Sequence, residues 1–176
     1  APEGWWEHLR QALMEDLESW EVHMANRQRV SPLMSDVVAL AFRFNRKDEI
    51  PALIQDLEQS GFKEIGARMR FLLEVGRGES QEALQAASLL LNDHAPETDL
   101  LYHVVSMAIA NPNQNLTSLF FELLEIHSPE MASSMGVMEE AQRWYRHLME
   151  KGRLEEAFLF VLKLSEYVDR SRGLDS

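Results

Sequence analysis

Cysteine is absent from this chain of 176 residues. Without a thiolate there is no cysteine nucleophile, no cysteine-held iron–sulfur cluster, no cysteine-ligated zinc and no disulfide. The absence fits a reducing compartment, so we expect an intracellular, cytoplasmic protein.

Long apolar runs are also missing. No segment approaches the roughly 20 apolar residues that a membrane span requires. The first residues, APEGWWEHLR, lack the apolar stretch of a cleavable signal. We therefore expect no membrane insertion. Because the chain begins with Ala rather than Met, we expect a processed product or a fragment of a longer protein.

Basic residues are scarce. The chain has 17 Lys and Arg against 29 Asp and Glu, which gives a net charge of −12 and a pI near 4.9. This balance opposes binding to a phosphate backbone or an anionic bilayer. We expect no nucleic-acid partner and favour a basic or neutral protein. The 45% hydrophobic content suffices for the core of one domain or one short repeat array.

Strand signals are nearly absent, and one helical pattern recurs at intervals of about 35 residues instead. Each repeat has two apolar triplets at i, i+4 and i+7, one for each helix. The first triplets are Met34/Val38/Ala41, Ile65/Met69/Leu72, Leu101/Val105/Ala108 and Ala141/Tyr145/Leu148. The second triplets are Ile50/Ile54/Leu57, Ala83/Ala87/Leu90, Leu119/Leu123/Ile126 and Ala157/Val161/Leu164. This arrangement predicts an all-α fold of antiparallel helical hairpins.

A first helix, from about Trp5 to Ala25, precedes the repeats and matches none of them. Its apolar stripe comprises Trp6, Leu9, Leu13, Leu17, Trp20 and Met24. We interpret it as a capping or docking helix whose Trp6 and Trp20 pack on the first hairpin. Trp5 points away from the stripe and is a candidate interface anchor.

Helix boundaries are marked by residues of known preference. Ser31-Pro32 and Ser128-Pro129 place a capping oxygen before a proline at the first helical position. Residues expected to end helices are Gly61, Gly76 or Gly78, Gly152, Asn45 and Asn111-Pro112. These marks predict nine helices with short connections. Between 129 and 151 two interpretations stay open, an unbroken helix or a break near Ser133 to Gly136.

Two segments resemble tetratricopeptide repeats. They are AQRWYRHLMEKGRLEEAFLFVLKL, with Gly152 in the turn and Ala157 at the helix crossing, and RFLLEVGRGESQEALQAASLL, with Ala83 at the crossing. Two other units depart from the pattern, with Ile50 and Leu119 in place of the small crossing residue, and we expect their helices to sit farther apart. The resemblance implies a short tetratricopeptide-like α-solenoid over residues 31–170, an extra N-terminal helix over 1–30 and a tail over 171–176.

In that family the first helix of each unit lines a concave peptide-binding face. The matching positions here are Ser35, Ala39, Gly66, Arg70, Tyr102, Ser106, Gln142 and Arg146, with Arg43 one turn farther along. The resemblance therefore implies partner contacts from Arg43, Arg70, Tyr102, Ser106, Gln142 and Arg146, and the arginines suit an acidic ligand. The alternative is that these arginines are solvated or pair with Glu on neighbouring helices. The Lys and Asn set of the family's carboxylate clamp is absent.

The last helix is apolar nearly all round, with Phe158, Phe160, Val161, Leu162 and Tyr167. We expect either a continuation of the solenoid or a partner subunit to cover it, and Phe158 and Tyr167 join Trp5 as candidate interface anchors. A stripe of methionines, Met131, Met135 and Met138, is interpreted as core.

Catalytic and metal-binding patterns are not found. The six histidines form no HExxH, and GxGxxG, GxxxxGK[ST] and GxSxG are absent. We therefore expect no enzyme, no metal and no cofactor, and predict a non-catalytic protein–protein interaction module, an adaptor or scaffold that binds a peptide, a helix or a partner subunit. One alternative is a structural subunit or fragment of a larger α-solenoid assembly, or a self-associating domain. Another is pentatricopeptide-like RNA binding.

Overall fold

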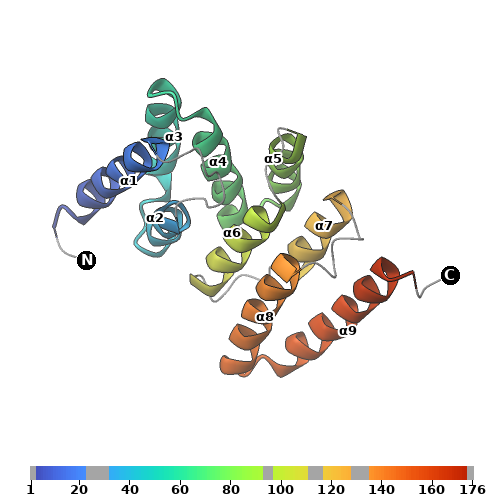
Figure 1. The fold of residues 1–176 in the computed structure, drawn as a ribbon. Helices are drawn as coiled ribbons and strands as arrows, with labels where there is room; N and C mark the ends of the chain where they lie inside the picture. The colour runs from blue at the N-terminus through green and yellow to red at the C-terminus, as the bar shows by residue number, and fades with distance from the viewer. Residues whose placement is uncertain (1–2, 23–31, 93–96, 111–116, 128–134, 174–176) are drawn as a thin grey trace. The chain divides into compact units, whose positions relative to one another are not determined.

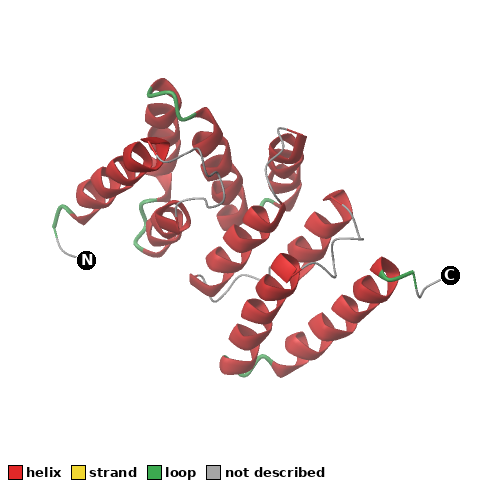
Figure 2. Ribbon diagram, viewed as in Figure 1, coloured by secondary structure: helices red, strands yellow, loops and turns green. Residues whose placement is uncertain are grey.

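The computed structural model describes residues 3–22, 32–92, 97–110, 117–127 and 135–173. Over these ranges the chain is all α and contains no strand (Figure 2). The elements within them (Figure 1) are α1 Trp5–Val22, α2 Pro32–Arg43, the 3-10 helix η2 Lys47–Glu49, α3 Ile50–Gln59, α4 Lys63–Arg77, α5 Ser80–Asn92, α6 Glu97–Ala110, α7 Thr117–His127, α8 Met135–Glu150 and α9 Leu154–Ser171. The predicted all-α fold class is confirmed.

The chain divides into two compact units, Ala1–Ala86 and Ala87–Ser176, and the division falls inside α5. Unit 1 therefore contains α1 to α4 with the start of α5. Unit 2 contains the end of α5 and α6 to α9.

Unit 1 is organised around α4, which packs against both α2 and α3, while α1 packs against α2. The predicted stripe of α1 is buried at Trp6, Leu13 and Leu17. Leu9 of the same stripe is partly exposed, and the remaining members, Trp20 and Met24, lie outside the described side chains. The predicted triplets of α2, α3 and α4 are buried throughout: Met34, Val38, Ala41, Ile50, Ile54, Leu57, Ile65, Met69 and Leu72.

One close approach in unit 1 requires glycine. Gly76 lies inside α4, and a Cβ added there would come within 2.3 Å of Cε2 of Phe42 on α2. The Phe42 ring therefore rests directly on the backbone of α4. The helix instead ends at Gly78, whose φ of 75° is left-handed, so Gly78 is the turn residue of the two glycines proposed from the sequence.

Four described helices, α2, α3, α4 and α8, end in the same hydrogen-bonded cap, which α2 and α8 illustrate. After α2, Arg46 N–H donates to the Ala41 carbonyl at 2.6 Å, and Asn45 has a φ of 61°. After α8, Arg153 N–H donates to the Leu148 carbonyl at 2.9 Å, and Gly152 has a φ of 71°. Both are Schellman caps, which need a left-handed residue at this position. The sequence prediction of Asn45 and Gly152 as helix-ending residues is confirmed.

Unit 2 contains two packed pairs of consecutive helices, α6 with α7 and α8 with α9, and α6 also packs against α8. Ala157 on α9, the small residue expected at the crossing, is buried, and so is Ala141 of the predicted α8 triplet. The core positions predicted for Ile126, Tyr145 and Val161 are wrong, because all three side chains are exposed. In α8 and α9 the preceding residues, Trp144 and Phe160, take the inward position instead.

The methionine stripe is not core where the structure describes it. Met135, at the start of α8, is 80% exposed, and Met138 is partly exposed. Met131 and the proposed break before Gly136 fall mainly in 128–134, outside the described residues, so the choice between the two interpretations of that stretch stays open.

Candidate functional site

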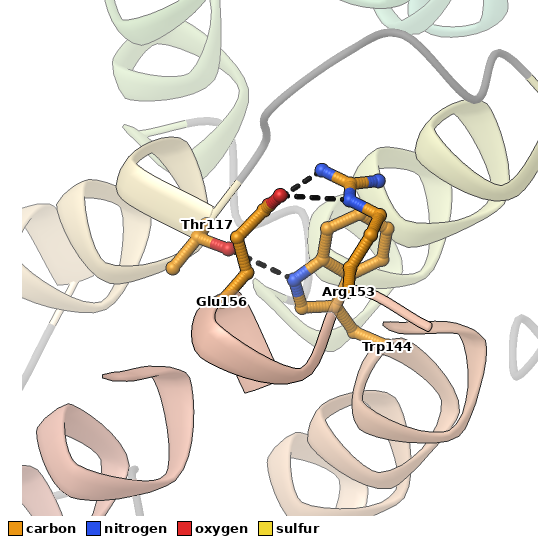
Figure 3. A network of polar contacts seen from close by, with 4 residues as sticks. All are labelled: Thr117, Trp144, Arg153 and Glu156. Carbon is orange, nitrogen blue, oxygen red and sulfur yellow. Dashed lines mark hydrogen bonds and ion pairs between the residues drawn. The ribbon is translucent and has the colours of Figure 1, made fainter. Parts of the chain in front are cut away.

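A polar network holds the N-terminal end of α9 against α7 and α8 (Figure 3). The indole N–H of Trp144 donates to Thr117 Oγ1 at 3.0 Å. Arg153, just before α9, lies over the Trp144 ring with its guanidinium carbon 5.5 Å from the ring centroid. It also donates to both carboxylate oxygens of Glu156, at 2.8 and 2.5 Å. The network thereby ties α7 to α8 through Thr117 and Trp144, and ties the start of α9 to α8 through Arg153.

Aromatic rings hold the middle of α9. Phe160 is fully buried, and its ring centroid lies 5.4 Å from that of Phe120 and 5.3 Å from that of Phe121. Such ring pairs add specific attraction to the burial of apolar area. The middle of α9 is thus anchored on α7.

A hydrogen bond to α7 holds the C-terminal end of α9. Tyr167 is 5% exposed, stacks on Phe121, and donates its hydroxyl to Glu125 Oε1 at 2.6 Å. Burial, followed by the Glu125 hydrogen bond and charge, raises the pKa of Tyr167 to about 12. The same hydrogen bond, supported by Arg170 at 3.3 Å, lowers the pKa of Glu125. Tyr167, predicted as an interface anchor, therefore already uses most of its surface inside unit 2.

The opposite side of α9 is uncovered. Five large apolar residues are exposed on this one helix, with Phe158 at 63%; they are Leu154, Phe158, Leu159, Val161 and Leu162. We call these five residues the α9 outer face. Phe158, predicted as an interface anchor, lies near its centre in the sequence. Because the inner face is held at both ends and in the middle, the outer face is presented on a fixed helix.

Two of the predicted groove residues are brought together by a residue that the sequence analysis did not single out. Arg143 on α8 donates to Ser106 Oγ at 3.0 Å, and its guanidinium carbon lies 4.8 Å from the Tyr102 ring centroid. It also donates to Glu140 at 2.5 Å. Burial raises the pKa of Glu140, although the charge and hydrogen bond of Arg143 act against this. The cluster joins α6 to α8 and engages the Tyr102 ring and the Ser106 oxygen.

The other predicted groove residues are divided between the two units. Arg43 and Arg70 belong to unit 1, whereas Gln142 and Arg146 lie on α8 in unit 2, and all four are exposed. Arg70 makes an ion pair with Glu58 at 3.2 Å. That pair matches the alternative considered from the sequence, in which the arginines pair with neighbouring Glu.

Trp5 is less available than predicted for an interface anchor. It is partly buried, and its ring makes edge-to-face contacts with Trp6 at 5.8 Å and with Phe44 at 5.3 Å between centroids. Trp5 therefore contributes to packing between α1 and the end of α2.

Two histidines of the described residues, His103 and His147, are buried. His147 on α8 stacks on Trp144, with a centroid distance of 5.4 Å. Burial, then the charges of Lys151 and Arg153, lower its pKa from 6.5. Over the described ranges, no three His, Asp or Glu side chains are grouped as a metal site. Among the described helices, none has the combined length and apolar character needed to cross a membrane.

Comparison of the chain with protein-family models, with curated proteins and with solved structures gives no match.

Proposed function

We propose that this chain is a non-catalytic protein-interaction module, an adaptor or scaffold that binds another protein through the α9 outer face. The observation that carries the proposal is an apolar surface left exposed on a helix whose other side is fully engaged. Contiguous exposed apolar surface on a folded chain is typical of an interaction site. Aromatic side chains such as Phe158 are enriched at interface cores.

The proposed architecture is a helix over 1–30, four tetratricopeptide-like hairpins over 31–170 and a tail over 171–176. Its support is the fourfold repeat of apolar triplets and the packed pairs α6–α7 and α8–α9. In such an array each hairpin buries its apolar face against the next one. The alternative, a structural piece of a larger α-solenoid, would use the same α9 outer face to receive another unit.

A groove built on the predicted arginines is less well supported. Binding through Arg70 would require its ion pair with Glu58 to break, and Tyr102 and Ser106 are already engaged by Arg143. For this reason we assign binding to α9 rather than to the arginines.

The test is a pair of charge insertions in the α9 outer face. Proximity labelling in the native cell identifies the proteins that bind the unmodified chain. The double variant Phe158→Asp/Leu162→Asp should no longer label these proteins, because a carboxylate buried in an apolar interface is strongly unfavourable. Both residues are exposed, so helicity and the midpoint of thermal unfolding should be retained.

The matched control is Gln142→Asp/Arg146→Asp, which places two carboxylates at exposed positions of the adjacent helix α8. It should leave the labelled proteins unchanged. Equal labelling by the unmodified chain and the α9 variant would contradict the proposed function.

A further inference from the structure

Two neighbouring rows of residues run along the exposed side of α9. On an α-helix, positions separated by four and three residues lie above one another. The first row is apolar and contains Leu154, Phe158 and Val161. The second row reads Glu155, Leu159, Leu162, Glu166 and Asp169, and all of these side chains are exposed. The second row is therefore apolar in its middle and acidic at both ends.

Within the described residues, the acidic ends of the second row, Glu155, Glu166 and Asp169, are not engaged by a basic side chain in an ion pair. The two cations within α9 are directed toward α7, since Lys163 lies over a ring of α7 and Arg170 pairs with a glutamate there. The carboxylates remain available to a partner.

A second copy of this chain fits the surface poorly. Antiparallel pairing centred between Leu159 and Leu162 would place Glu155 of one copy opposite Glu166 of the other, because the two glutamates are equally distant from that centre. In-register parallel pairing would set each glutamate beside its own equivalent. Opposed like charges are destabilising, and each copy carries a net charge of −12. Phosphate-bearing surfaces meet the same repulsion.

We infer that the occupant of the α9 outer face is an amphipathic helix with an apolar centre and a basic residue at each end of it. This inference rests on the proposed function and names its class of partner. Glu155 and Glu166 are separated by three turns, or roughly 16 Å along the axis at about 1.5 Å per residue. The partner helix should therefore carry Lys or Arg about three turns apart, with apolar residues at i, i+3, i+4 and i+7 between them.

The inference is tested with two synthetic helical peptides of about 20 residues that share one leucine face. One peptide has Lys at both flanking positions, and the other has Glu. The Lys peptide should bind the full chain roughly tenfold more tightly than the Glu peptide by fluorescence anisotropy. The difference should shrink as salt rises from about 50 to about 500 mM, because salt screens exposed charges.

Charge reversal on α9 locates the effect. In Glu155→Lys/Glu166→Lys the preference should invert toward the Glu peptide, whereas the matched reversal Glu139→Lys/Glu150→Lys at exposed positions of α8 should leave it unchanged. Phe158→Asp should remove binding of both peptides. Failure of the Lys peptide to bind, equal binding of the two peptides, or an effect of the α8 reversal as large as that of the α9 reversal would overturn the inference.

Self-association is the competing outcome. Sedimentation of the chain alone should give a monomer; a dimer that Phe158→Asp dissociates would make a second copy the occupant and overturn the inference. The proposed function has its own test. It is contradicted if Phe158→Asp/Leu162→Asp still labels the same proteins as the unmodified chain. If that variant loses them while the peptides do not discriminate, the proposed function stands and only the basic helix is excluded.

Discussion

Helices α4 and α9 both carry large apolar residues on more than one side, and they differ in how much of that apolar surface is buried. Helix α4 lies against α2 and α3, and it buries Ile65, Met69, Phe71, Leu72, Leu73 and Val75. Helix α9 buries Ala157, Phe160 and Tyr167, while the five residues of its outer face stay exposed. The comparison shows that the same kind of sequence gives a core helix in one place and a candidate interface in another.

The largest loss of stability is expected for Phe160→Ala, which removes a ring from the buried side of α9. The fully buried ring contacts Phe120 and Phe121, so its loss should lower the free energy of unfolding by about 3–5 kcal/mol. Phe158→Ala, on the exposed side of the same helix, should change it by less than about 0.5 kcal/mol. Urea unfolding monitored by circular dichroism measures both. Similar values for the two variants would mean that α9 has no distinct inner and outer face.

A second prediction sharpens the picture of α4 as a helix confined by its neighbours. Gly76→Ala should destabilise the chain by about 1–2 kcal/mol, because displacing the Phe42 ring costs more than the helix propensity gained from Ala. In Gly66→Ala the atom nearest to the new Cβ, at 3.1 Å, belongs to the flexible Glu58 side chain. That variant should be neutral or up to about 1 kcal/mol more stable. Thermal unfolding midpoints check the pair, and destabilisation by Gly66→Ala alone would contradict it.

The third prediction concerns the attachment of α9 to α7. Tyr167→Phe removes the hydrogen bond to Glu125 and should cost about 1 kcal/mol, whereas Tyr145→Phe, at an exposed position of α8, should cost nothing measurable. The pKa of Glu125 is lowered from 4.5 mainly by this bond. Its stabilising contribution is therefore present above that value and lost as pH falls through the folded pKa. The difference between wild type and Tyr167→Phe should shrink in acid. A difference independent of pH would show that the bond does not involve the ionised carboxylate.

The smallest effect is expected at His147. Its pKa is lowered from 6.5 by burial and by the charges of Lys151 and Arg153. The unfolded chain therefore binds the proton more readily, so stability contributed by the neutral ring is lost as pH falls below about 6.5. His147→Gln should flatten the dependence of the unfolding midpoint on pH in that range. His8→Gln, at an exposed position of α1, is the control and should leave the dependence unchanged.

Local patterns in the sequence predicted the helices and their ends. The i, i+4, i+7 spacing located the helices of the repeats, and Asn45, Gly152 and one of Gly76 and Gly78 were predicted as ending residues because their backbone preferences act within one turn. Tyr145 and Val161 were misassigned to the core. Each lies one position from a buried aromatic residue, and only the neighbouring helices decide which of two adjacent apolar residues turns inward.

The candidate site could be predicted from the sequence only in part, because the burial of each side chain is decided by neighbouring helices. Phe158 was predicted as an interface anchor, and it is exposed on the α9 outer face, whereas Tyr167 was predicted beside it and is buried against α7. Arg143 was missed, since its link to Tyr102 and Ser106 depends on how α8 lies against α6. Apolar character can be read along one chain segment, but the coverage of a side chain depends on residues distant in sequence.

The contact between Phe42 and Gly76 ties together two positions that are far apart in the sequence. The Phe42 ring fills the space that a side chain at position 76 would need, so the close packing of α2 on α4 limits the combined volume of the two side chains. A change to a larger residue at position 76 becomes tolerable only after the residue at 42 has shrunk. In sequences that descend from this chain, a larger residue at position 76 should therefore occur together with a smaller residue at position 42.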